Sequence, residues 1–203
     1  MTLEVLIAGE GKTELGRWAL AAAHREAPQT RGDSQDVGLI EALVRRRGAI
    51  VASAMLWKSI RKFRAGHHAG HETRNVLGLA LVAKEHGHTL VFLRDRDGDG
   101  DREAQIVEGI RRAQKEFPAV SIVGGCAVES IEAFGLWALG DARAEQRRDP
   151  KAELHRRGHE GVRALVELVS GADLSRLPPD SAAGTWFRRL DVVLGQPTRT
   201  TDD

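Results

Sequence analysis

Closely spaced aspartates follow an apolar run near the middle of the chain. Residues 90–93 read Leu-Val-Phe-Leu, and they lead into aspartates at every second position: Asp95, Asp97, Asp99 and Asp101. This pattern is typical of a buried strand that ends in negative charge. Only the interleaved arginines could neutralise that charge from within the stretch, whereas hard divalent cations prefer oxygen ligands of this kind. The stretch therefore indicates a cation site.

Acidic residues also follow two other apolar runs. Glu10 and Glu14 come after residues 5–8, and Glu129 and Glu132 come after residues 120–123. The carboxyl ends of parallel strands meet at one edge of a sheet, so these acids should converge there. Converging carboxylates repel one another unless a cation lies between them. We therefore expect a Mg²⁺ or Mn²⁺ site whose ligands come from three strand ends: Glu10, Glu14, Asp95, Asp97, Glu129 and Glu132.

Two metal ions about 3.5–4 Å apart that clamp a phosphodiester are a standard use of such a cluster. In this hypothesis Glu14 and Glu129 complete a second metal site or orient water. The residues expected to be catalytic are Glu10, Glu14, Asp95 and Asp97. A single acid after a strand is more often a helix cap, and this is the favoured interpretation of Asp99 and Asp101, because the first turn of a helix favours acids.

Two rival motifs fail at a required residue. The run 95–100 fits the opening of an EF-hand calcium loop, but the position that needs a bidentate glutamate is Ile106. A looser calcium loop stays open. Gly11-Lys12-Thr13 after a strand resembles a P-loop, but Leu6 stands where the motif needs its first glycine.

Hydrophobic periodicity predicts strands that alternate with helices over about 140 residues. Apolar runs bounded by turn residues predict strands at 5–8, 49–56, 89–93 and 120–123. Helical spacing lies between these runs, for example over residues 72–85. The alternation implies βαβ units. We expect an α/β fold with a mostly parallel sheet of about four strands flanked by helices.

The strand signal ends beyond residues 149–150. Apolar spacing around Leu165 and around Trp186 predicts helices only. The expected organisation is an α/β domain over residues 1–145, a helical C-terminal extension packed on it over 146–195, and a polar, flexible tail over 196–203.

The composition narrows the classes of protein to consider. With 203 residues, 41% of them hydrophobic, the chain can form one globular core. A net charge of +1 argues against non-specific electrostatic binding over the whole surface, yet it allows a local basic patch. A single cysteine, the lack of a signal peptide and the lack of a long apolar run predict a cytoplasmic protein without a membrane partner.

A basic stretch with interleaved aromatic residues spans residues 57–64. A nucleic-acid backbone would suit it. The residues expected to bind nucleic acid are Lys12, Lys58, Arg61 and Lys62. The alternative is a solvated helix face with Trp57 and Phe63 in the core.

The order of the acids resembles the Toprim domain of topoisomerases, primases and the overcoming-lysogenization-defect nucleases. Glu10 matches the glutamate after the first strand of that domain, and Asp95 with Asp97 matches its Asp-x-Asp. Those nucleases have a second glutamate four residues later, which Glu14 matches, and a Ser-x-Glu, which Ser130 and Glu132 match.

The whole chain is similar to a small stand-alone Toprim-like family of bacteria. The shared motifs are Glu-Gly-x-x-Glu at 10–14, Asp-x-Asp at 95–97, Ile-Glu-Ala-aromatic at 131–134, and the segments 149–151 and 186–190. The resemblance implies a Toprim-like, Rossmann-like sheet. It also implies Mg²⁺- or Mn²⁺-dependent phosphodiester chemistry on nucleic acid, in a setting such as phage defence or a mobile element.

Departures from the family limit what the resemblance implies. The chain has no tyrosine, which a topoisomerase needs, and no nucleotide-binding ATPase segment. The nucleases are also expected to use a lysine near the metals, and the candidates are Lys12, Lys58, Lys62 and Lys151.

The main hypothesis is a divalent-metal-dependent nuclease that acts on DNA or RNA. The first alternative is a non-catalytic subunit that binds metal or nucleic acid in a larger complex, with an ATPase or another protein encoded nearby as its partner. A calcium-stabilised structural protein is a further alternative. A homo-oligomer is left open.

Overall fold

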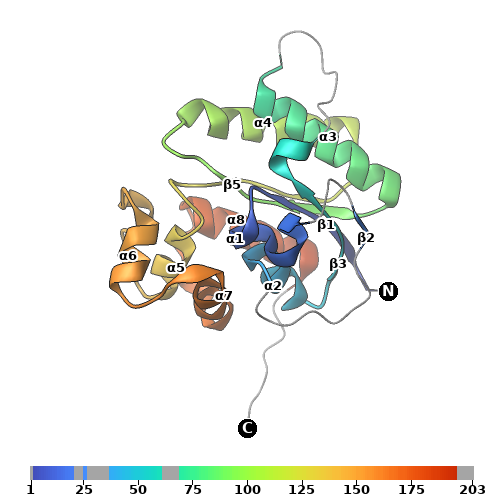
Figure 1. Cartoon of the computed structure of the whole chain (residues 1–203). Helices are drawn as coiled ribbons and strands as arrows, with labels where there is room; N and C mark the ends of the chain where they lie inside the picture. The colour runs from blue at the N-terminus through green and yellow to red at the C-terminus, as the bar shows by residue number, and fades with distance from the viewer. Residues whose placement is uncertain (1, 21–24, 27–36, 61–68, 196–203) are drawn as a thin grey trace.

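A five-stranded sheet forms the centre of the computed structural model, which describes residues 2–20, 25–26, 37–60 and 69–195 (Figure 1). Its strands are β1 (Glu4–Gly9), β2 (Arg25–Glu26), β3 (Ile50–Leu56), β4 (Thr89–Phe92) and β6 (Ile122–Val123), in the order β2-β3-β1-β4-β6. Strands β3, β1, β4 and β6 are parallel, and β2 pairs antiparallel with β3. The expected α/β fold with a mostly parallel sheet of about four strands is confirmed.

A second, two-stranded sheet extends the carboxyl edge of the first. Strands β5 (Arg94–Asp95) and β7 (Cys126–Ala127) pair in parallel just after β4 and β6. The sequence predicted uninterrupted strands at 89–93 and 120–123. Instead, β4 ends at Phe92, whose carbonyl accepts a hydrogen bond from the Trp186 indole at 3.0 Å. A side chain thus takes the place of a backbone partner at the break.

Alternating side chains of the strands pack on opposite faces of the sheet, as the period-2 geometry of a strand requires. Leu6 and Phe92 belong to the core on one face, under α3 (His71–His86) and α4 (Gly100–Glu116). Ile7 and Val91 belong to the core on the other face, with α1 (Lys12–Leu15), α2 (Leu39–Arg45) and α8 (Ala182–Leu194). Figure 1 shows the sheet between these two helical layers.

Only helices follow residue 149 within the described part of the chain, as the sequence predicted: α6 (Pro150–Arg156), α7 (Gly161–Gly171), the single turn η5 (Leu174–Arg176) and α8. Helix α8 contacts β6 and β7, whereas α6 and α7 contact α5 (Ala133–Ala138). The remaining single turns are η1 (Gly16–Leu20), η3 (Trp57–Ser59) and η4 (Ala144–Gln146).

Trp186 and Phe187 of α8 form an aromatic cluster with Phe134 of α5, with ring centroids 5.2–6.2 Å apart. The C-terminal helix is therefore part of the core that supports the carboxyl edge of the sheet. Across the described ranges, no helix combines the length and the apolar character that crossing a membrane would require.

Candidate metal centre

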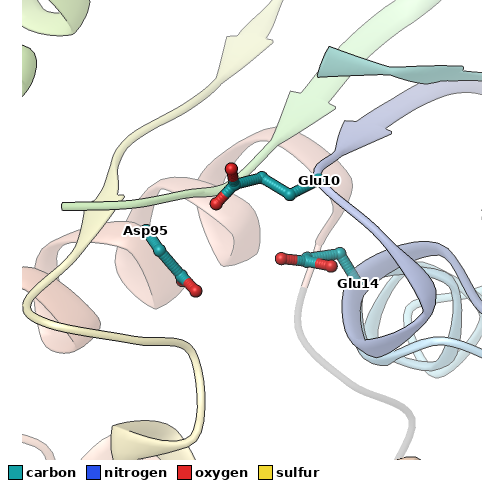
Figure 2. Close-up of side chains that lie close together, drawn as sticks. All are labelled: Glu10, Glu14 and Asp95. Atoms are coloured by element: carbon teal, nitrogen blue, oxygen red, sulfur yellow. The ribbon is translucent and has the colours of Figure 1, made fainter. Parts of the chain in front are cut away.

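Carboxylates from two neighbouring parallel strands meet at the carboxyl edge of the sheet. Glu10 directly follows β1, Glu14 lies in α1, and Asp95 ends β5. One carboxylate oxygen of each residue lies within 4.8 Å of the other two, and Figure 2 shows the three side chains directed toward a common space. We call Glu10, Glu14 and Asp95 the acidic group. It forms because β1 and β4 are adjacent in the sheet.

A tight turn between β1 and α1 positions Glu14. The Gly11 N–H donates to Glu14 Oε2 at 3.0 Å, so the side chain folds back over the start of its own short helix. Gly9 makes this approach feasible, because a Cβ at that position would lie 2.6 Å from the Glu14 Cβ. Glu14 is only 4% exposed as a result.

Asp95 is fixed from the opposite side of the group. It pairs with Ala127 in the short sheet, and its Oδ1 accepts a hydrogen bond from the Ile131 N–H at 2.9 Å. The carboxylate therefore connects the end of β5 to the segment that follows β7. Its second oxygen has no hydrogen-bond partner among the described residues.

Burial and the repulsion of nearby carboxylates disfavour negative charge on Glu14 and Asp95. Burial is the largest cause that raises the pKa of Asp95, and the charges of Glu14, Glu132 and Asp97 raise it further, to about 7. Burial also raises the pKa of Glu14, and Glu132 adds to the effect. None of the described residues forms an ion pair with Glu14 or Asp95. A divalent cation would relieve this repulsion in a way that the surrounding protein does not.

Glu132 lies beside the acidic group without belonging to its closest cluster. It occupies the residue before α5, and its side chain is partly exposed. Its charge acts on both Glu14 and Asp95, as their raised pKa values indicate. All three strand ends expected from the sequence thus contribute acids to this edge, with Glu132 at its margin.

Asp97 and Glu129 are directed to arginines instead. Arg102 Nη1 donates to Asp97 Oδ2 at 2.6 Å, and Arg96 Nη2 donates to Glu129 Oε1 at 3.3 Å. Both acids have positive φ values, 51° and 61°, so the backbone is not extended at Asp97 as the alternating pattern had suggested. The left-handed backbone turns these two carboxylates away from the compact group.

Several arginines neutralise acids around this edge of the sheet. The sequence analysis missed Glu72, which lies next to two of these arginines. This glutamate is 8% exposed at the start of α3. Its carboxylate accepts from the Trp57 indole at 2.6 Å and lies 3.6 Å from both Arg94 Nε and Arg102 Nε. Arg94 also forms an ion pair with Glu10. No motif marks Glu72, because a lone acid in a first helical turn is common.

The sequence left a calcium loop and a helix cap as alternatives for the later aspartates. Asp99 is the N-cap of α4, and its carboxylate accepts from the N–H groups of Asp101 and Arg102. Asp101 lies in the first turn of that helix. The cap predicted for Asp99 is confirmed, and both residues are exposed.

Two of the four residues expected to bind nucleic acid lie near the acidic group. Lys12 is exposed at the start of α1. Lys58 lines a cavity of about 380 Å³ together with Glu10 and Arg94. Arg61 and Lys62 lie outside the described residues, as does Phe63. Trp57 is buried, as the alternative interpretation expected.

The chemistry of the donor set fits Mg²⁺ or Mn²⁺. Both are hard ions that take carboxylate oxygens, and the acidic group offers three carboxylates, of which Glu14 and Asp95 have no ion-pair partner among the described residues. Comparisons with protein-family models, with curated proteins and with solved structures found no match for this chain.

Proposed function

We propose that this protein is a divalent-metal-dependent nuclease that hydrolyses phosphodiester bonds in DNA or RNA, with Mg²⁺ or Mn²⁺ as its cofactor. The observation that carries the proposal is the acidic group: Glu10, Glu14 and Asp95 converge within 4.8 Å, and the latter two have no ion-pair partner among the described residues. Lys12 and Lys58 add positive charge near the group, which suits a polyanionic substrate.

The residues at this edge have separate tasks in the proposed reaction. Glu14 and Asp95 hold the ion, Glu10 completes the site, and Glu132 orients the attacking water. A bound Mg²⁺ supplies an activated water and offsets the charge of the scissile phosphate. In the hydrolysis, the water oxygen bonds to phosphorus, one bridging P–O bond breaks, and the departing oxygen ends as a hydroxyl. Lys58 contacts the phosphate backbone from the neighbouring cavity.

The Toprim resemblance is part of this proposal. The resemblance implies a glutamate after the first strand and an Asp-x-Asp after a later strand. Glu10 follows β1 and Asp95 follows β4, and the parallel pairing of β1 with β4 supports the proposal. A role in phage defence or in a mobile element belongs to the same proposal.

The proposal is tested by incubating supercoiled plasmid and labelled RNA with the purified protein, in Mg²⁺, in Mn²⁺ and in EDTA. We expect metal-dependent cleavage that Asp95→Asn reduces about 100-fold or more, because even residues that only support a metal ligand commonly contribute 10- to 100-fold. Asp99→Asn is the matched control, since asparagine also caps helices and Asp99 lies outside the acidic group. Cleavage that Asp95→Asn leaves intact would contradict the assignment.

A second candidate is a non-catalytic subunit that binds metal or nucleic acid in a larger complex. The ion pair between Arg94 and Glu10 favours it, because a carboxylate held by a guanidinium is less available to a metal ion. This candidate predicts Mn²⁺ binding without cleavage by the pure protein, and cleavage only after a partner protein is added.

A further inference from the structure

A cavity of about 530 Å³ lies next to the acidic group, between α1, α6 and α7. Thr13 and Glu132 form the wall on the side of the acidic group, and Thr13 directly precedes Glu14 in the chain. A molecule in this cavity would therefore lie beside the carboxylates that hold the metal in the proposed function. The volume is within the range of about 300–1,000 Å³ that is usual for small-ligand sites.

The floor of the cavity is apolar. Leu154 of α6 and Val162 and Leu165 of α7 line it, and Leu154 and Leu165 are buried. Gly135 lets α7 approach α5 closely, because a Cβ at residue 135 would lie 2.7 Å from Leu165 Cδ1. Such a floor favours a flat, weakly polar group such as a nucleobase over a fully hydrated ion.

One cation at the rim is free to bind an anion. Arg156 pairs with Glu153, and His155 lies 3.4 Å from Glu160. Lys151, in contrast, has no acidic partner among the residues that the structure describes. Lys151 lies in the first turn of α6, and Asp149 caps that helix by accepting from the Ala152 N–H at 2.9 Å.

We propose that this cavity binds one nucleotide unit of the nucleic-acid substrate, with the base against Leu154, Val162 and Leu165 and the phosphate toward Lys151. The inference rests on the proposed nuclease function, because it places that nucleotide next to the bond that is hydrolysed. It adds an apolar site for a base next to the carboxylates of the acidic group.

Calorimetric titration of the metal-free protein in EDTA tests the inference, with a nucleoside 5′-monophosphate, ribose 5-phosphate and inorganic phosphate as probes. We expect the nucleotide to bind at least 10-fold more tightly than the two probes that lack a base. Val162→Trp, which fills the cavity, should weaken nucleotide binding at least 10-fold, and Lys151→Gln should weaken it several-fold.

Matched controls lie on α4, on the opposite face of the sheet. Val107→Trp changes a 58% exposed valine and Lys115→Gln an exposed lysine, and both should leave nucleotide binding unchanged. Circular dichroism establishes that each variant is folded, and if Val162→Trp fails to fold, Lys151→Gln still decides. Equal binding of nucleotide and ribose 5-phosphate, or binding that Val162→Trp or Lys151→Gln leaves unchanged, would overturn the inference.

The two proposals fail in different ways. Nucleotide binding is measured without metal and without turnover, so it can be present in a protein that cleaves nothing, and this outcome would contradict the nuclease function alone. Metal-dependent cleavage by a protein that binds no free nucleotide would contradict the inference about the cavity alone.

Discussion

Asp95 determines how much negative charge the acidic group carries near neutral pH. Its pKa is raised to about 7, first by burial and then by the charges of Glu14, Glu132 and Asp97. The Ile131 N–H, which donates to it, lowers the pKa and only partly compensates. A proton and a metal ion therefore compete for the same site, and metal binding should tighten as the pH rises toward 8.

The same raised pKa makes a prediction about stability without metal. The folded protein holds a proton on Asp95 up to about pH 7, whereas the unfolded chain releases it near the ordinary value of 3.8, so stability falls as the pH rises between these values. Asp95→Asn removes this penalty and keeps an acceptor for the Ile131 N–H. We expect the variant to be more stable than the wild type by roughly 1–3 kcal/mol at pH 8.

Urea unfolding in EDTA at pH 5 and pH 8 measures this effect. The advantage of Asp95→Asn should shrink toward pH 5, because the wild-type carboxyl is then protonated in the fold. Asp99→Asn, in the exposed cap of α4, is the control for a carboxylate outside the group. An advantage that does not depend on pH would show that repulsion within the acidic group is not its cause.

At the scale of elements, the turn between β1 and α1 sets the geometry of the group. Gly9 and Glu14 approach so closely that a Cβ on residue 9 would lie 2.6 Å from the Glu14 Cβ. Helix α1 has only four residues, so it cannot absorb a displacement along its length. The placement of Glu14 thus depends on Gly9, which has no side chain that could bind a metal ion.

Gly9→Ala should therefore displace Glu14. We expect Mn²⁺ affinity to fall at least 10-fold and stability to fall by about 1–3 kcal/mol, as is usual when a packed site is overfilled. Gly11→Ala is the matched control in the same turn, because a Cβ at residue 11 meets nothing within 4 Å. Calorimetric titration with Mn²⁺ compares the two variants, and equal losses in both would contradict the role given to Gly9.

The helices and strands that could be predicted from the sequence were those with a strong apolar pattern. The long helices α3 and α4 were predicted because their apolar spacing is regular, and the parallel strands β1, β3, β4 and β6 were predicted because each coincides with an apolar run. β2, β5 and β7 were not predicted, because these two-residue strands lie outside the apolar runs. Their existence depends on contacts distant in sequence, such as the Trp186 indole that ends the pairing of β4.

The acidic group could be predicted from the sequence for a related reason. In a parallel sheet the carboxyl ends of β1 and β4 lie at the same edge, and because the two strands are neighbours, Glu10, Glu14 and Asp95 converge. The arginine pairing of Asp97 and Glu129 and the role of Glu72 could not be predicted, because they depend on two left-handed residues and on a helix that starts far away in the sequence. Nor does any motif mark the cavity between α6 and α7.

At the scale of the whole molecule, the C-terminal helix and the sheet share one core. Trp186 is 2% exposed, packs with Phe134 and Phe187, and donates its indole N–H to Phe92 of β4. The region after residue 149 therefore stabilises the sheet whose edge carries the acidic group, and it also forms the walls of the neighbouring cavity.

Trp186→Ala should destabilise the whole protein by about 3–5 kcal/mol, the usual cost of removing a large buried aromatic side chain. Unfolding should remain a single transition when it is followed both by circular dichroism and by tryptophan fluorescence. Val192→Ala, on the same helix but 85% exposed, should change stability by less than about 0.5 kcal/mol. A first transition in which the C-terminal helices unfold while the sheet stays folded would contradict the claim that the two share one core.

The central claim is that Glu10, Glu14 and Asp95 together bind a divalent cation. A crystal soaked in Mn²⁺ and measured for anomalous scattering tests it most directly. We expect a peak in the space that the three side chains face, within about 2.0–2.6 Å of carboxylate oxygens from Glu14 and Asp95. A fully soaked crystal with no peak in that space would contradict the claim. Manganese bound only elsewhere, with the ion pair between Arg94 and Glu10 unchanged, would contradict it as well.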